Sequence, residues 1–121
     1  MLRVVEVIPL SESSPDSEVL LTDGYFECLA FSSPTTVRIG DEVREPLHLF
    51  GLRSVMLSEG LELGIAQPSE GHPRRLVATV VTLDPLTVGV GRFRFEIDDY
   101  AFGGIQVGDI VQIECGRMDL W

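Results

Sequence analysis

The chain has 121 residues, which is enough for one domain and leaves no room for a second sizeable core. It carries nine Arg and no Lys against 19 acidic residues, so its formal net charge is −10. This charge argues against a binder of duplex nucleic acid that relies on a broad basic surface. The lack of Lys excludes Schiff-base lysine chemistry and a Walker A phosphate loop.

Apolar residues recur with a period of two, and Gly, Pro, Asp and Ser interrupt them every 8 to 12 residues. We predict strands over residues 2–8, 19–22 and 25–31, of which the last two flank Asp23-Gly24. That dipeptide is typical of a two-residue type I′ hairpin, in which both central residues take positive φ. A further strand is predicted over 42–50, and Pro46 removes a ladder donor there, which indicates an edge strand or a bulge.

In the second half we predict a hairpin of strands 53–57 and 61–65, then a central strand over 76–83, which is rich in β-branched residues. Residues 88–97 read as one strand with Phe93, Phe95 and Ile97 on one face and charged residues on the other. The tail 107–121 contains a last strand that opens after Gly108-Asp109. Short strands at this spacing predict an all-β chain of about seven to nine mostly antiparallel strands.

We expect these strands to close into one small barrel that spans residues 1–121, because an open sheet of this size leaves exposed edges. The turn-to-strand segments at Gly40-Asp41 and Gly108-Asp109 are similar to those of OB-fold and SH3-like small barrels. The resemblance is to a fold, covers about a dozen residues and identifies no named family. OB-folds often bind oligonucleotides or oligosaccharides on one sheet face, and the resemblance transfers no binding residue to this chain.

The segment from Arg92 to Phe95 alternates cations with aromatic rings, a pattern that can serve phosphates and bases of single-stranded nucleic acid. Arg92 and Arg94, with the aromatic residues Tyr25 and Tyr100, are therefore the candidate ligand-binding residues. The competing interpretation places the two Phe in the core and the two Arg in solvent, and it explains the same alternation without a ligand.

Glu96, Asp98 and Asp99 form the densest acidic cluster, which offers the oxygen ligands that Mg²⁺ or Ca²⁺ prefers. The spacing matches no EF-hand loop, and a solvated strand end followed by a turn is the favoured interpretation. The two histidines, His48 and His72, cannot make a three-His zinc site. Cys28 and Cys115 lie in isolated apolar strands, so we predict buried free thiols and no metal or other cofactor.

No dinucleotide-binding fingerprint or nucleophile elbow occurs, which favours a non-enzymatic role. Residues 1–30 hold one Arg and six acidic residues, so half of the net charge lies in a quarter of the chain. The leading hypothesis is a protein-binding or accessory module whose partner has a basic surface. The alternative is an OB-type binder of single-stranded nucleic acid or oligosaccharide. With two cysteines and no long apolar run, a cytoplasmic protein without membrane contact is expected, of undetermined oligomeric state.

Overall fold

The computed structural model describes residues 1–44, 46–58, 60–98 and 103–121. The described chain is all-β and forms twelve strands. In chain order these are β1 (Leu2–Pro9), β2 (Ser17–Thr22), β3 (Glu27–Ser32), β4 (Glu42–Val43), β5 (Leu47–Phe50), β6 (Ser54–Leu57), β7 (Gly64–Ile65), β8 (Arg74–Leu83), β9 (Leu86–Val90), β10 (Phe93–Ile97), β11 (Ile110–Cys115) and β12 (Arg117–Leu120). The prediction of an all-β chain is confirmed.

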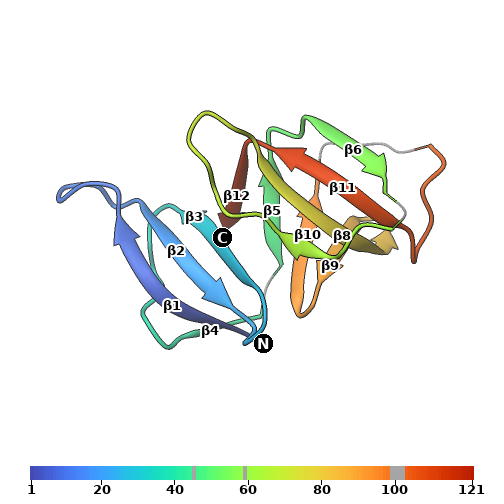
Figure 1. The fold of residues 1–121 in the computed structure, drawn as a ribbon. Coiled ribbons are helices and arrows are strands. Elements are labelled where there is room, and N and C mark those ends of the chain that lie inside the picture. The colour runs from blue at the N-terminus through green and yellow to red at the C-terminus, as the bar shows by residue number, and fades with distance from the viewer. Residues whose placement is uncertain (45, 59, 99–102) are drawn as a thin grey trace.

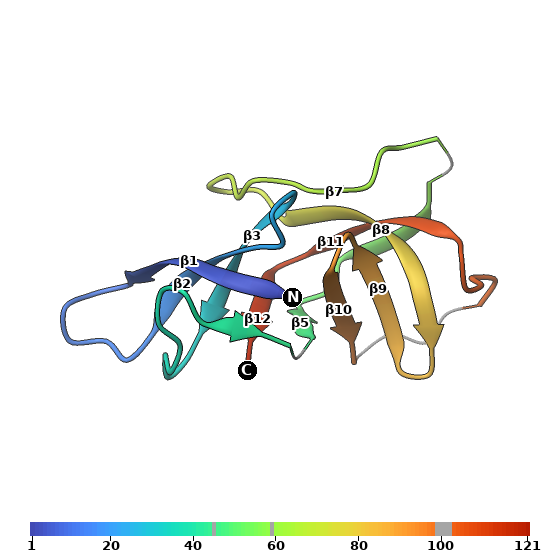
Figure 2. The ribbon, with the colours of Figure 1, turned by 90° about the horizontal axis from the view of Figure 1, so that it is seen from below.

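The strands form one sheet in the order β4-β1-β2-β3-β12-β5-β10-β9-β8-β11-β6, and β7 pairs with β8 beside this path. Ribbons β1 to β4 lie on one side and β6 and β8 to β11 on the other, with β5 and β12 between them (Figures 1 and 2). Two neighbouring pairs, β10 with β5 and β12 with β3, are parallel, and the other pairs are antiparallel. Each parallel pair brings together segments that are far apart in the sequence.

The predicted closed barrel is not confirmed, because the sheet is open in the part of the chain that the structure describes. Its end strands, β4 and β6, are two and four residues long. Short edge strands present few unpaired backbone groups, so this sheet limits its exposed edges by shortening them and not by closure. The predicted strand 42–50 is divided into β4, which lies at an edge of the sheet, and β5, which lies inside it between β12 and β10. Pro46, which cannot donate to a ladder, lies between the two strands and belongs to neither.

The strand count exceeds the predicted seven to nine because three predicted strands are each divided in two. Residues 88–97 form β9 and β10, which are separated by a turn in which Gly91 has a φ of +56°. The tail is divided at Gly116, between β11 and β12. At each glycine the alternation of apolar residues shifts by one position, from Val88 and Val90 to Phe93 and Phe95 and from Ile113 and Cys115 to Met118 and Leu120. This shift marks the division, and the prediction of one continuous strand for each segment overlooks it.

The predicted type I′ turn at Asp23-Gly24 is wrong. Four residues, 23 to 26, connect β2 and β3, and among the described residues only glycines have positive φ. The Asp23 carboxylate accepts hydrogen bonds from the N–H groups of Tyr25 (2.9 Å) and Phe26 (2.7 Å). This side-chain turn replaces the backbone geometry of a two-residue hairpin, and only Gly24 needs a positive φ.

Inward-facing residues from both groups of strands, β1 to β4 and β5 to β12, form one hydrophobic cluster. Its largest fully buried side chains include Phe93, Phe95, Leu21, Leu47 and Leu76. The predicted inward face of residues 93–97 is therefore the face that packs into the core. Its alternate residues, which include Arg94, Glu96 and Asp98, lie on the opposite face of the sheet and supply the polar groups considered next.

Candidate functional site

A pocket of about 300 Å³ lies where the paired strands β1 and β4 approach the β9–β10 hairpin. Leu2 and Val43, which are partners in the β1–β4 ladder, supply apolar lining. The pocket also collects three of the nine Arg of the chain. Its lining residues are Met1, Leu2, Val43, Arg44, Arg92 and Arg94. We call this site the arginine pocket.

The guanidinium of Arg94 is held in place by the hairpin on which it lies. Its Nη1 donates to the carbonyl oxygens of Gly91 and Phe93, both at 2.8 Å. The group lies over Gly89, its ladder partner on β9, where an added Cβ would be 2.7 Å from Nη1. Gly89 therefore leaves the space that the guanidinium occupies. Both N–H donors of Nη1 are used, and among the described residues the donors of Nε and Nη2 have no acceptor.

Arg92 is positioned by the neighbouring β2–β3 turn. Its backbone N–H donates to Oδ2 of Asp23 at 2.9 Å, so this carboxylate joins the two hairpins. Burial opposes ionisation of Asp23, but hydrogen bonds from the N–H groups of Arg92, Phe26 and Tyr25 outweigh it and lower the pKa below its ordinary value of 3.8. Tyr25, on the same turn, is 87% exposed and makes an edge contact with Phe26.

The charges of the pocket are poorly compensated by the protein. Arg44 is 3.9 Å from a carboxylate oxygen of Glu42, and both side chains are at least half exposed, so this pair is weak. Within the described chain, neither Arg92 nor Arg94 forms an ion pair. In a protein with twice as many acidic as basic residues, this local surplus of positive charge is an unusual feature.

A larger cavity of about 370 Å³ lies beside β7 and contrasts with the arginine pocket. Its lining is mainly apolar, with Leu63, Ile65 and Leu76 among the residues. Its one Arg, Arg75, donates to Glu114 at 3.0 Å, so the protein already neutralises that charge. The arginine pocket is thus the better candidate for a charged ligand.

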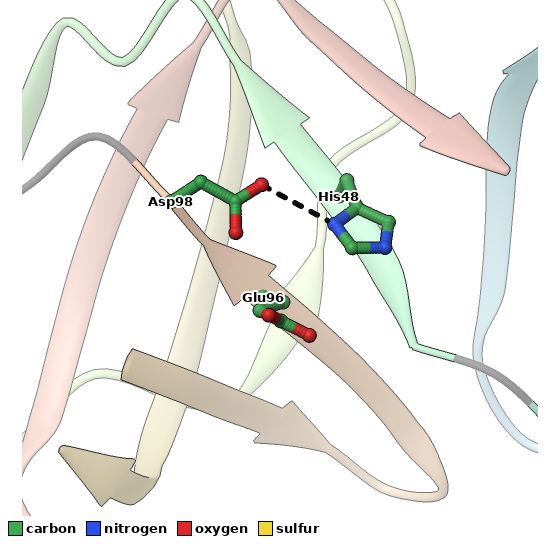
Figure 3. Close-up of side chains that lie close together, drawn as sticks. All are labelled: His48, Glu96 and Asp98. Carbon is green, nitrogen blue, oxygen red and sulfur yellow. Dashed lines mark hydrogen bonds and ion pairs between the residues drawn. The ribbon is translucent and has the colours of Figure 1, made fainter. Parts of the chain in front are cut away.

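A second group of polar side chains lies on the outer face where β5 and β10 run parallel. Glu96 and His48 are partners in this ladder, and Asp98 follows just beyond the end of β10 (Figure 3). Nδ1 of His48 is 3.4 Å from Oδ2 of Asp98. The predicted acidic cluster therefore includes a histidine that lies about fifty positions earlier in the chain. The third predicted member, Asp99, lies outside the described residues.

His48 is buried although it lies on the polar face of β5, because aromatic and charged groups of the adjoining strand cover it. The ring of Trp121 stacks on the imidazole with centroids 3.5 Å apart and planes at 9°. On the β12 side its ladder partner is Asp119, which accepts two hydrogen bonds from the Arg117 guanidinium at 2.6 and 2.8 Å. Asp119 is therefore engaged elsewhere and leaves His48 to face Glu96 and Asp98.

The structure brings together some of the predicted ligand-binding residues. Arg92 and Arg94 line one pocket, and Tyr25 lies on the turn whose Asp23 binds Arg92. Tyr100 lies outside the described residues. Sequence reasoning missed Arg44, which only the β1–β4 pairing brings to the pocket, and likewise His48, which only a parallel pairing brings to Glu96. No local sequence signal marks either contact.

Comparison with known proteins gives no family: the chain matches no protein-family model, no curated protein and no solved structure. Over the residues that the structure places, we find no helix with the length and apolar character that crossing a bilayer requires.

The two cysteines, Cys28 and Cys115, are free and buried. Burial raises the pKa of the Cys28 thiol to about 12 and that of Cys115 to about 11.

Proposed function

We propose that this protein is a binding module for a small phosphate-bearing ligand, which it holds in the arginine pocket. The observation that supports this is the convergence of Arg44, Arg92 and Arg94 on one cavity, two of them without a carboxylate partner in the described chain. Guanidinium groups suit phosphate because they are always charged and donate two parallel N–H bonds to its oxygens. The bound anion supplies the compensation that the protein does not.

The size and charge of the surroundings favour a small anion over a long one. A volume of about 300 Å³ is at the lower end of the range for small-molecule sites. A polyanion that extends beyond the pocket meets a protein with a net charge of −10, which repels it. A single phosphate group, in contrast, interacts mainly with the three nearest guanidinium groups, since salt screens more distant charges.

Single-stranded nucleic acid is the second candidate, and the position of Tyr25 favours it. This ring is 87% exposed on a turn that is hydrogen-bonded to Arg92, so it offers a face on which a base can stack. In this alternative a nucleotide phosphate occupies the arginine pocket. A barrel of OB type is not needed for this interaction, since a cationic pocket and one aromatic platform suffice.

The protein-binding role inferred from the acidic first quarter of the chain stays a prediction. Glu6, Glu12 and Glu27 are exposed on β1, the β1–β2 connection and β3, which is compatible with a basic partner and equally with a solvated surface. A pull-down with this chain as bait addresses it. Loss of a captured protein when these three residues are changed to Gln supports the role, and capture that is unaffected opposes it.

The test of the proposed function is calorimetric titration with inorganic phosphate, a nucleoside 5′-monophosphate, the parent nucleoside and a short single-stranded oligonucleotide. We expect the two small phosphate compounds to bind and the nucleoside not to bind. Arg92→Ala and Arg94→Ala should each weaken binding by about tenfold, the loss of one charge-assisted hydrogen bond. Arg38→Ala is the matched control, because it makes the same charge change in an exposed loop outside the pocket.

Two results would overturn the proposal: no binding of either small phosphate compound at low salt, or equal affinity of the pocket variants and the wild type. If the oligonucleotide binds far more tightly than the monophosphate and Tyr25→Ala weakens that binding, the role in binding single-stranded nucleic acid would replace the proposed function. Binding that Arg38→Ala weakens as much as Arg92→Ala would show a general charge effect and reject the pocket.

A further inference from the structure

Three potential metal ligands meet on the outer face of β5 and β10. One nitrogen of His48 and one carboxylate oxygen each of Glu96 and Asp98 all lie within 4.8 Å of one another. Figure 3 shows the Asp98 carboxylate directed at the imidazole, with Glu96 on the same side of the strand pair. His48 and Glu96 are ladder partners of two parallel strands, so the backbone fixes their spacing, and Asp98 follows directly after the end of β10.

His48 is the member of this cluster that a solvated acidic surface does not explain. The residue is 8% exposed, and its Nδ1 has Asp98 as its only partner among the described residues. That distance of 3.4 Å exceeds the usual range of about 2.7–3.2 Å for a hydrogen bond of a nitrogen donor. A buried imidazole thus points into a pair of carboxylates without a well-formed bond. The stack with Trp121 holds the ring in this orientation.

We propose that His48, Glu96 and Asp98 bind a divalent transition-metal ion, with Zn²⁺ as the best-fitting ion and Mn²⁺, which accepts carboxylate ligands, as a weaker alternative. Imidazole suits zinc and its neighbours in the first transition row, whereas Mg²⁺ and Ca²⁺ prefer sites made only of oxygen. Three protein ligands leave one position of a tetrahedral zinc ion open for water or another ligand. This site is separate from the arginine pocket and does not depend on the proposed function.

The observed spacing is close to what the ion requires. Ligand atoms about 2.0–2.2 Å from a tetrahedral zinc ion are roughly 3.3–3.6 Å apart. The His48–Asp98 distance already matches this spacing. Glu96 is half-buried and Asp98 has a 42% exposed side chain, so both carboxylates have room to turn toward the ion while the stacked imidazole stays fixed.

Other strong zinc ligands in the described chain do not compete at neutral pH. The ligand form of cysteine is the thiolate, and Cys28 and Cys115 are buried with their pKa values raised to about 12 and 11. Asp119 is bound by Arg117 through two hydrogen bonds. His72, the only other histidine of the sequence, is exposed and lies outside the cluster of three ligands.

The test uses Trp121, the single tryptophan of the sequence, as a built-in reporter, because its ring stacks on the proposed ligand. Zn²⁺ or Mn²⁺ added to the purified chain should cause a saturable change in tryptophan fluorescence and raise the melting temperature. Mg²⁺ at the same concentration should cause neither. Calorimetric titration with Zn²⁺ gives the affinity independently of any optical change.

Glu96→Gln and Asp98→Asn keep the size of each side chain and the histidine–tryptophan stack, and each should weaken Zn²⁺ binding at least about tenfold. His72→Gln is the matched control and should bind Zn²⁺ like the wild type. The proposal is overturned if Zn²⁺ and Mn²⁺ leave fluorescence, melting temperature and calorimetric heat unchanged. It is also overturned if the two cluster variants keep wild-type affinity, if His72→Gln abolishes binding, or if Mg²⁺ binds as tightly as Zn²⁺.

Discussion

The contact between the β2–β3 and β9–β10 turns predicts that Gly91→Ala will strongly destabilise the protein. Gly91 has a φ of +56°, which favours glycine. A Cβ added there would overlap Oδ2 of Asp23 and would lie 2.8 Å from Cδ2 of Phe26. Neither neighbour is the free end of a flexible side chain, because Asp23 accepts three backbone hydrogen bonds and Phe26 packs against the core.

The expected loss in the free energy of unfolding is the sum of two effects. Placing a residue with a Cβ in the left-handed region costs roughly 1–2 kcal/mol. Overpacking against Asp23 and Phe26 adds typically 1–3 kcal/mol, because the carboxylate must move away from its N–H donors. We therefore expect Gly91→Ala to lower the free energy of unfolding by about 2–5 kcal/mol.

Gly24→Ala is the matched control for backbone strain. Gly24 lies on the facing turn with a φ of +95°, and an added Cβ would meet nothing within 4 Å. Its substitution should cost only about 1–2 kcal/mol. Urea denaturation of both variants, with midpoints compared at equal slope, measures the difference. The reasoning fails if Gly91→Ala is no less stable than Gly24→Ala.

Three further predictions concern the same fold. Because the pKa of folded Asp23 lies below 3.8, its contribution to stability is complete above that pH and is lost as the pH falls through the lower folded value. Acid titration of Asp23→Asn should thus show a weaker pH dependence, and an unchanged profile would contradict this. The thiols of Cys28 and Cys115 should react with a disulfide reagent at mildly alkaline pH only after denaturation, and fast reaction of the native protein would refute their burial. Phe95→Ala should lower the free energy of unfolding by about 3–5 kcal/mol in urea, and a loss below about 1 kcal/mol would be inconsistent with a fully buried ring.

Much of the strand content follows from local pattern, and the pairing of strands does not. Alternation around Phe93, Phe95 and Ile97 reports which residues face the core, because a strand exposes its side chains to opposite faces in turn. The alternation shifts by one position between Val90 and Phe93, and this shift marks the reversal at Gly91 that the prediction of one strand over 88–97 overlooks. The alternation does not distinguish an open sheet from a barrel, since closure depends on contacts between distant strands.

The residues of the candidate sites also differ in whether a local pattern or the pairing of strands identifies them. Arg92 and Arg94 could be selected from the sequence because they are neighbours on one strand face. Arg44 could not, because the pairing of β4 with β1 brings it to the pocket. His48 alternates with the buried Leu47 and Leu49, yet it is itself buried, and the ring of Trp121 stacks on it. Its place beside Glu96 depends on tertiary structure alone.

The position of β12 in the sheet has a consequence for the order in which the protein can assemble. This strand follows the other eleven along the described residues, and among them it is the only link in the strand order between β3 and β5. During synthesis, strands β1 to β4 and strands β5 to β11 can each pair among themselves, but the ladder that joins the two groups must wait for Arg117–Leu120. Completion of the sheet is therefore a late, long-range step, and a nascent chain that stops short of these residues leaves the edges of β3 and β5 without their native partner.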